Sequence, residues 1–150
     1  MSISVYGESP LKKGFEAFLK ASKLPDHNCA VIFADKSSGE DVLKLIEALS
    51  VVHDRILAVC DYFDCEGADP EAAARLHAVI GTVKAFARSK GIRINLLRYG
   101  ATDKANLPDA VALERSAEPW EIFEPILFFA GDGCDFMTGQ IIDVNGGIIY

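Results

Sequence analysis

A short segment with acidic residues and two cysteines comes closest to having the residue types of a metal site. Residues 60–66 read Cys-Asp-Tyr-Phe-Asp-Cys-Glu and follow an apolar run. Zinc ligands usually come as two closely spaced pairs, and no histidine lies near this segment. We therefore predict no metal site, but a buried Cys60 thiol followed by an exposed acidic loop. Because open α/β sheets bind ligands at the carboxyl ends of their strands, this loop is the best place for a small-ligand pocket.

The sequence contains no recognisable set of residues for acid–base or nucleophilic catalysis. The three histidines are dispersed, and none forms a nucleophile motif with a serine or cysteine; they are His27, His53 and His77. Three tyrosines, Tyr62, Tyr99 and Tyr150, have an ionisable phenol, but no lysine is paired with any of them. The sequence thus predicts no catalytic residue.

The spacing of apolar residues predicts strands and helices in alternation. Short apolar strands are expected at residues 3–6, 29–34, 55–60, 92–97 and 140–144. Helical stripes separate them, and the strongest helix runs from Asp69 to Gly91. This alternation indicates the α/β class: a single doubly wound, Rossmann-like, three-layer domain over residues 1–150 with about five parallel strands.

Charge and composition argue against several classes of protein. The formal net charge of −7 disfavours a non-specific grip on nucleic acid and docking on anionic lipid. Apolar runs are far shorter than a membrane helix needs, and the first residues do not read as a secretory signal. Four scattered cysteines make no disulfide framework. We therefore expect a cytoplasmic protein with reduced thiols that binds neither nucleic acid nor membrane.

Three segments in the second half of the sequence are similar to one known family. They are residues 91–95 (GIRIN), 119–132 (PWEIFEPILFFAGD) and 138–147 (TGQIIDVNGG). They resemble the entry into the sixth strand, the last helix and the last strand of short-chain dehydrogenases/reductases (SDR). Members of that family bind a nicotinamide dinucleotide on a Rossmann-type sheet and transfer a hydride. The resemblance implies that fold, and an origin among oxidoreductases.

The start of the chain is also similar to the family. Gly7 lies where the family has its glycine-rich turn, and Asp35 matches the acid that binds the adenosine ribose in NAD-preferring members. Leu11, Lys12 and Lys13 occupy the place of two further glycines, and their side chains would crowd a pyrophosphate. The resemblance therefore implies a vestigial cofactor site at Gly7 and Asp35, with no bound cofactor expected and NAD as the alternative.

The catalytic residues of the family are absent from the sequence. No Tyr-x-x-x-Lys occurs anywhere, and alignment places either Ala72 and Leu76 or Asp69 and Ala73 at those two positions. The chain is also shorter than full-length members, so the resemblance implies that a middle portion is missing. Removing the family's third and fifth strands would leave a sheet of order 2-1-3-4-5.

The family's contact elements remain although its catalytic residues do not. Its members form oligomers through the long helix and through the last helix and strand. Here, alanines at 72, 73, 74 and 78 would allow close helix approach, and the apolar end at 148–150 would reach a neighbour. We therefore predict a non-catalytic subunit, a pseudoenzyme, that assembles with an active full-length SDR and stabilises or regulates it. The alternatives are a homo-oligomer that binds a small ligand, or an NAD(P)-dependent oxidoreductase with a rebuilt site.

Overall fold

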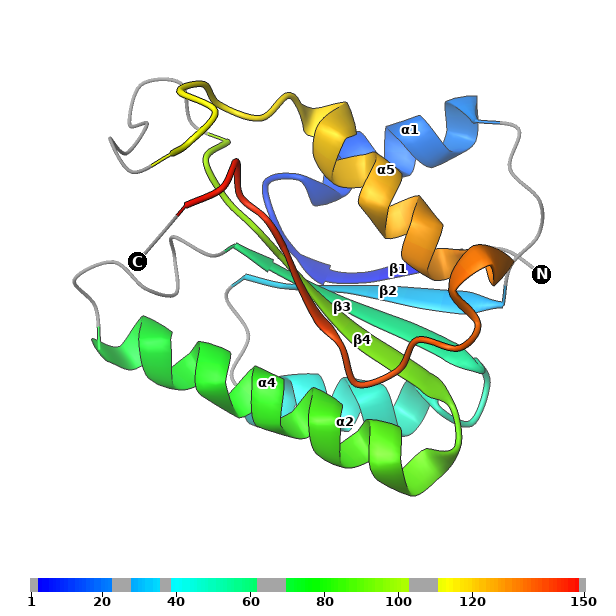
Figure 1. Cartoon of the computed structure of the whole chain (residues 1–150). Helices are drawn as coiled ribbons and strands as arrows, with labels where there is room; N and C mark the ends of the chain where they lie inside the picture. Colours follow the sequence, from blue (N-terminus) through cyan, green and yellow to red (C-terminus); the bar gives the residue numbers. More distant parts are fainter. Residues whose placement is uncertain (1–2, 23–27, 36–38, 62–69, 103–110, 149–150) are drawn as a thin grey trace.

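A computed structural model describes residues 3–22, 28–35, 39–61, 70–102 and 111–148 (Figure 1). The strands within these segments are β1 (Ser4–Glu8), β2 (Cys29–Ala34), β3 (Arg55–Asp61), β4 (Arg93–Tyr99) and β5 (Ile141–Val144). The helices are α1 (Lys12–Ala21), α2 (Gly39–Leu49), α4 (Pro70–Lys90), α5 (Pro119–Ala130) and the short 3-10 helix η1 (Asp132–Cys134). The predicted α/β alternation is confirmed.

All five strands form one parallel sheet, as predicted, but their order differs from the prediction. The sheet runs β1-β2-β3-β4-β5, so each strand pairs with the next strand in the sequence. The predicted order 2-1-3-4-5 is wrong, because β2 lies between β1 and β3. The two outer strands of the sheet are therefore β1 and β5.

The composition of the first two strands explains this order. All six residues of β2 (CAVIFA) are buried, as suits a strand with neighbours on both sides. The residues of β1 (SVYGE) are only partly buried, and they include a serine, a glycine and a glutamate. The reversed order would have placed the most apolar strand at an exposed edge.

Of the helices that the structure describes, two cover each face of the sheet. Alternate strand residues join α2 and α4 in one apolar cluster, which includes Val42 and Val83, and join α1 and α5 in the other, which includes Phe15 and Ile126. Because successive strands advance in one direction, crossovers through opposite faces have opposite hands. Two of the four crossovers are therefore left-handed, the sense that is rare in parallel sheets.

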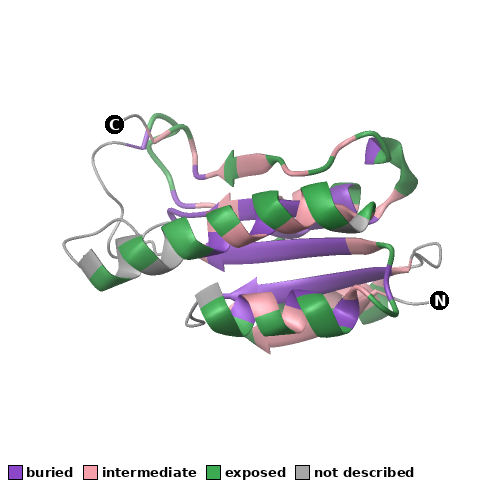
Figure 2. Ribbon diagram, turned by 90° about the horizontal axis from the view of Figure 1, so that it is seen from below, coloured by how far each residue is buried: buried purple, intermediate pink, exposed green. Residues whose placement is uncertain are grey.

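The layers bring the carboxyl ends of the parallel strands to one edge of the sheet and their amino ends to the other. The interior strands are almost entirely buried between the helices (Figure 2). Among the helices that the structure describes, none has the length and apolar character needed to cross a membrane. The two ends of the strands therefore hold the polar groups from which a site would be built.

Candidate functional site

A buried tyrosine and a buried aspartate meet at the carboxyl ends of the strands. Tyr99 ends β4, and Asp35 directly follows β2. The Tyr99 hydroxyl donates a hydrogen bond of 2.7 Å to Oδ2 of Asp35, and the backbone N–H of Asp61 donates one of 2.7 Å to Oδ1. Only 1% of Tyr99 and 5% of Asp35 are exposed. Both carboxylate oxygens therefore accept hydrogen bonds from within the chain.

The environment of Tyr99 keeps its phenol protonated. Burial raises the pKa of Tyr99 far above its ordinary value, and the negative charges of Asp35 and Asp61 raise it further. A tyrosine can act as a general base only when its phenol is deprotonated near the working pH. The geometry thus makes Tyr99 a hydrogen-bond donor to Asp35 rather than a proton acceptor.

The turn between β1 and α1 closes over the same edge. Oγ of Ser9 lies 3.2 Å from the Tyr99 hydroxyl and accepts a hydrogen bond from the N–H of Leu11. The Lys12 ammonium folds back and donates a hydrogen bond of 2.8 Å to the carbonyl of Gly7. The polar side chains of this turn, Ser9 and Lys12, are therefore engaged in hydrogen bonds within the chain.

A hollow of about 470 Å³ lies outside this turn. Its lining residues are Gly7, Glu8, Ser9, Pro10, Lys12, Lys13 and Glu16. Two lysines and two glutamates face it, so the charges of its lining balance. A helix N-terminus that holds a pyrophosphate needs a positive, open approach to its backbone N–H groups. Here a ligand's phosphates would meet two carboxylates as well.

Gly7 has a structural requirement that the sequence did not reveal. Its φ of +78° lies in the left-handed region, and a Cβ atom there would come within 1.9 Å of the Phe33 carbonyl oxygen. Close contact with β2 therefore requires glycine whether or not a cofactor binds. The cofactor roles of Gly7 and Asp35 stay predictions.

The other sequence candidates do not converge on this edge. Of the acidic loop, only Cys60 and Asp61 lie within the described residues, and Cys60 is buried as predicted. Within those residues no three His, Cys, Asp or Glu side chains gather as around a metal ion. His53 is buried, and its Nδ1 lies 3.0 Å from the Asn28 side-chain oxygen. His77 is exposed on α4, and His27, Tyr62 and Tyr150 lie outside the described residues.

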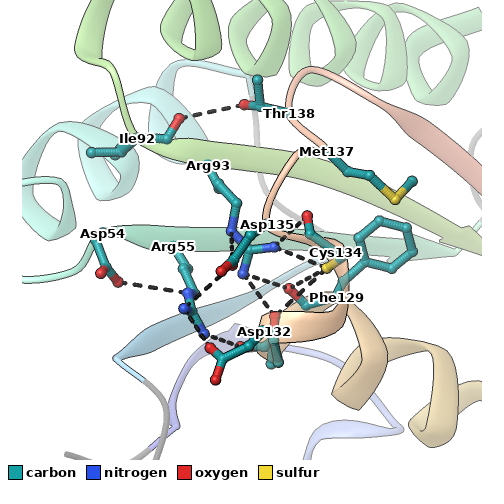
Figure 3. A network of polar contacts seen from close by, with 12 residues as sticks. Asp54, Arg55, Ile92, Arg93, Phe129, Asp132, Cys134, Asp135, Met137 and Thr138 are labelled. Atoms are coloured by element: carbon teal, nitrogen blue, oxygen red, sulfur yellow. Dashed lines mark hydrogen bonds and ion pairs between the residues drawn. The ribbon is translucent and has the colours of Figure 1, made fainter.

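A second polar network lies at the opposite edge, where β3 and β4 begin (Figure 3). The Arg93 guanidinium donates hydrogen bonds to the carbonyls of Cys134 (2.8 Å) and Gly131 (3.0 Å) and to the Cys134 sulfur (2.9 Å). Arg55 donates to the Ala130 carbonyl and pairs with Asp132 at 2.6 Å. These contacts fasten the end of α5 and η1 to the sheet.

The cysteines at this edge are buried and structural. Cys29 and Cys134 are free thiols, each at most 3% exposed. Burial raises the pKa of the Cys29 thiol to about 12, although the nearby Arg93 and Arg55 lower it. The Cys134 thiol donates a hydrogen bond of 3.1 Å to the Phe128 carbonyl. This edge therefore holds the last helix in place and presents no reactive thiolate at Cys29.

Sequence reasoning found the residues of the carboxyl edge only in part. The sequence suggests Asp35 as a ribose ligand. It suggests Tyr99 only as an ionisable phenol with no paired lysine. Their contact joins residues 64 positions apart, which no local pattern indicates. Ser9 was not noticed, and its place next to a glycine-bearing strand end was the only signal for it.

Comparisons with known proteins extend the likeness to about half of the chain. No protein-family model matches. The "Uncharacterized oxidoreductase YmfI" of Bacillus subtilis is 33% identical over 95 residues, which are 55% of this chain and 39% of that protein. The 3-oxoacyl-[acyl-carrier-protein] reductase FabG of Chlamydia trachomatis is 36% identical over 90 residues, 51% of this chain and 36% of that protein. The chain thus spans about two fifths of the length of these curated relatives.

Solved structures extend the likeness of fold to nearly the whole chain. The 3-alpha-hydroxysteroid dehydrogenase of Pseudomonas sp. B-0831, solved with NADH, superposes with a TM-score of 0.68. The match covers 98% of this chain and 96% of that one at 16% identity, so it shows the fold alone. The curated relatives and the structural neighbours both point to the short-chain dehydrogenase/reductase family, to which about half of the chain is similar in sequence.

Proposed function

We propose that the chain is a non-catalytic SDR-like subunit that acts by assembling with other chains. The observation that carries this proposal is the closed carboxyl edge, where Tyr99, Asp35 and the N–H of Asp61 satisfy one another. Open α/β sheets bind their ligands at this edge. A ligand there would have to break a buried hydrogen bond to a carboxylate, which is among the stronger hydrogen bonds in proteins.

The chemistry of the chain supports the same proposal. Hydride transfer in the family needs a phenol of lowered pKa beside a lysine, and the sequence has no such pair. The tyrosine that lies at the strand ends has its pKa raised instead. The expected place of action is the cytoplasm, as the sequence predicts.

The partner in this proposal is an active, full-length dehydrogenase of the same family. The 3-oxoacyl-[acyl-carrier-protein] reductase that the comparisons found is the first type of partner to test. The chain and such a reductase from the same genome would be co-expressed with an affinity tag on the chain. We expect the reductase to co-purify at a fixed ratio and its thermal stability or specific activity to change. Failure of every SDR of that genome to co-purify would contradict the proposal.

The main alternative is an NAD(P)-dependent oxidoreductase with a rebuilt site. The hollow beside the β1–α1 turn, with Lys12 and Lys13 in its lining, is the observation that favours it. This alternative requires dinucleotide binding by the chain alone. A titration with NADH and NADPH separates the two, since the proposed subunit binds neither.

A further inference from the structure

Asn145 directly follows β5 and is itself followed by Gly146 and Gly147. Only 7% of Asn145 is exposed. Its side-chain Oδ1 accepts hydrogen bonds from the backbone N–H groups of Gly147 (3.1 Å) and Ile148 (3.3 Å). A carbonyl that accepts two such hydrogen bonds has a more electrophilic carbon, because the donors stabilise negative charge on its oxygen. The fold therefore activates Cγ of Asn145 towards attack by a nucleophile.

The amide nitrogen of the same side chain has no hydrogen-bond partner among the residues that the structure describes. The hydrogen bonds of the Asn145 side chain all go to Oδ1. In the described part of the chain, no buried side-chain nitrogen or oxygen lacks a partner, so Nδ2 of Asn145 reaches solvent. An amide nitrogen leaves a carbonyl carbon as ammonia after it gains a proton, which solvent can supply. The leaving group is therefore accessible.

The backbone N–H of Gly146 likewise makes no hydrogen bond within the described residues. The Gly146 carbonyl, by contrast, accepts a hydrogen bond of 3.1 Å from the N–H of Leu113. Gly146 has no Cβ, so its own side chain does not shield its nitrogen from the preceding side chain. Bond formation between this nitrogen and Cγ of Asn145 would close a five-membered ring. The nucleophile is therefore available next to the activated carbon.

From these three features we propose that Asn145 is a site of intramolecular deamidation. The Gly146 nitrogen gives its proton to solvent and bonds to Cγ of Asn145. The Cγ–Nδ2 bond then breaks, and Nδ2 leaves as ammonia with a proton from solvent, so the product is a cyclic succinimide. Water opens this ring at either carbonyl, which gives aspartate, or isoaspartate with the main chain continuing through Cγ. These steps involve no oxidation or reduction and need only water.

The isoaspartate product disturbs the contact between the end of β5 and residues 111–113, which lie beside it (Figure 1). Gly146 is tightly packed there, because a Cβ atom on it would lie 2.7 Å from Cγ1 of Val111. Isoaspartate adds a methylene carbon to the main chain before Gly146 and so displaces it. Ordinary aspartate leaves the main chain unchanged, and its carboxylate accepts the same two hydrogen bonds. Isoaspartate at 145 therefore lowers the stability of the fold, whereas aspartate does not.

The test is incubation of the folded full chain in mildly alkaline buffer, followed by proteolysis and mass spectrometry. We expect Asn145 to be converted to a mixture of aspartate and isoaspartate, with release of ammonia. The same chain unfolded in guanidinium chloride is the reference. Because the nucleophile, the carbonyl and the leaving group are all available in the fold, the rate at Asn145 should lie within about tenfold of the rate in the unfolded chain.

Two other asparagines of the same chain serve as internal controls. Nδ2 of Asn28 donates to the Val52 carbonyl (3.2 Å), and Nδ2 of Asn95 donates to the Met137 carbonyl (2.9 Å). Neither is followed by glycine. We expect no product at either position while half of Asn145 reacts.

Two variants complete the test. Asn145→Gln keeps an amide but would need a larger ring, and it is expected to give no product at residue 145. Asn145→Asp supplies the aspartate product without isoaspartate. The isoaspartate form, separated by chromatography, is expected to melt at a lower temperature than Asn145→Asp. Circular dichroism confirms that each variant is folded.

Several results would overturn the inference. These are a folded chain with no product at Asn145, a rate there more than about tenfold below that of the unfolded chain, equally fast reaction at Asn28 or Asn95, and aspartate without isoaspartate, since only the ring gives isoaspartate. An isoaspartate form that melts with Asn145→Asp would overturn the effect on residues 111–113. The proposed function is tested separately, by co-purification and by titration with NADH, and none of these results bears on it.

Discussion

The two edges of the sheet use polar groups in contrasting ways. At the amino edge, two arginines reach backbone carbonyls and exposed carboxylates and hold α5 and η1 against the strands. At the carboxyl edge, one buried carboxylate accepts from a phenol and a backbone N–H that belong to two other strand ends. The amino edge is a fastening between elements. At the carboxyl edge, where open α/β sheets generally bind ligands, these polar groups bond to one another.

The two edges also differ in how much of their polar network lies in segments similar to the family. The segments similar to the family include Arg93 and residues 119–132, which make the amino-edge fastening. At the other edge, Asp35 matches a family residue, whereas its donor Tyr99 and the neighbouring Ser9 belong to no family motif recognised in the sequence. The contacts that hold α5 and η1 to the sheet thus involve none of the residues Ser9, Asp35 and Tyr99.

Gly7→Ala should have the largest effect, since it breaks the carboxyl edge at its backbone. The new Cβ would lie 1.9 Å from the Phe33 carbonyl oxygen, at a φ of +78° that alanine disfavours. Overpacking and backbone strain together should cost about 4 kcal/mol of unfolding free energy. Urea denaturation measures it. Gly133→Ala is the control, because its Cβ would meet nothing closer than 3.7 Å; equal losses in the two variants would contradict the account.

Arg93→Met should break the amino edge. The substitution leaves the carbonyls of Cys134 and Gly131 without their charged donor, and the Arg93 side chain is only 12% exposed. We expect a loss of about 3 kcal/mol, the usual cost of removing one partner from a buried charge-assisted network. Arg115→Met, whose side chain is 52% exposed, should cost clearly less, because solvent screens an exposed ion pair. If Arg93→Met lowered the unfolding free energy as little as Arg115→Met does, the Arg93 network would not stabilise the attachment of α5 and η1 to the sheet.

Tyr99→Phe removes one hydroxyl group from the carboxyl edge. Oδ2 of Asp35 then loses its 2.7 Å donor while the ring still fills the core. We expect a loss of about 2 kcal/mol. A double-mutant cycle with Asp35→Asn should show coupling of about 1 kcal/mol. Additive losses would mean that the two side chains do not hold each other.

The smallest effect should come from pH, at the start of α5. Two hydrogen bonds from Arg115, of 2.6 and 2.7 Å, and one from the N–H of Glu118 lower the pKa of Glu121 to about 2. Because this pKa is depressed in the folded chain, its stabilising contribution is complete above the ordinary value near 4.5 and is lost as the pH falls towards 2. Arg115→Met should therefore lower the urea midpoint at pH 6 and have a much smaller effect near pH 2. An equal effect at both values would contradict the assignment.

The sequence was sufficient to predict the helices and strands, but not the order of the strands in the sheet. The apolar run 29–34 and the helix after Asp69 were predicted because periodicity and capping are local properties. The strand order was missed because the prediction assumed that the family's third and fifth strands are the missing ones. In the structure β2, whose six residues are all buried, lies between β1 and β3.

The candidate site shows the same limit. Asp35 was predicted to follow a strand, and it does follow β2. Its hydrogen-bond donors, however, come from β3 and β4. The tyrosine at the end of β4 was examined for a neighbouring lysine, whereas its structural partner is a carboxylate far along the chain. Contacts between strand ends depend on the strand order, so they could not be predicted before it was known.

Isothermal titration of the full chain with NADH and with NADPH tests the closed carboxyl edge most directly. Tyr99→Phe would be titrated in parallel, to show whether one hydrogen bond alone keeps the site closed. The account predicts no binding heat and no rise in melting temperature at millimolar cofactor for the unmodified chain. A saturable heat with a dissociation constant below the millimolar range, accompanied by a rise in melting temperature, would contradict it.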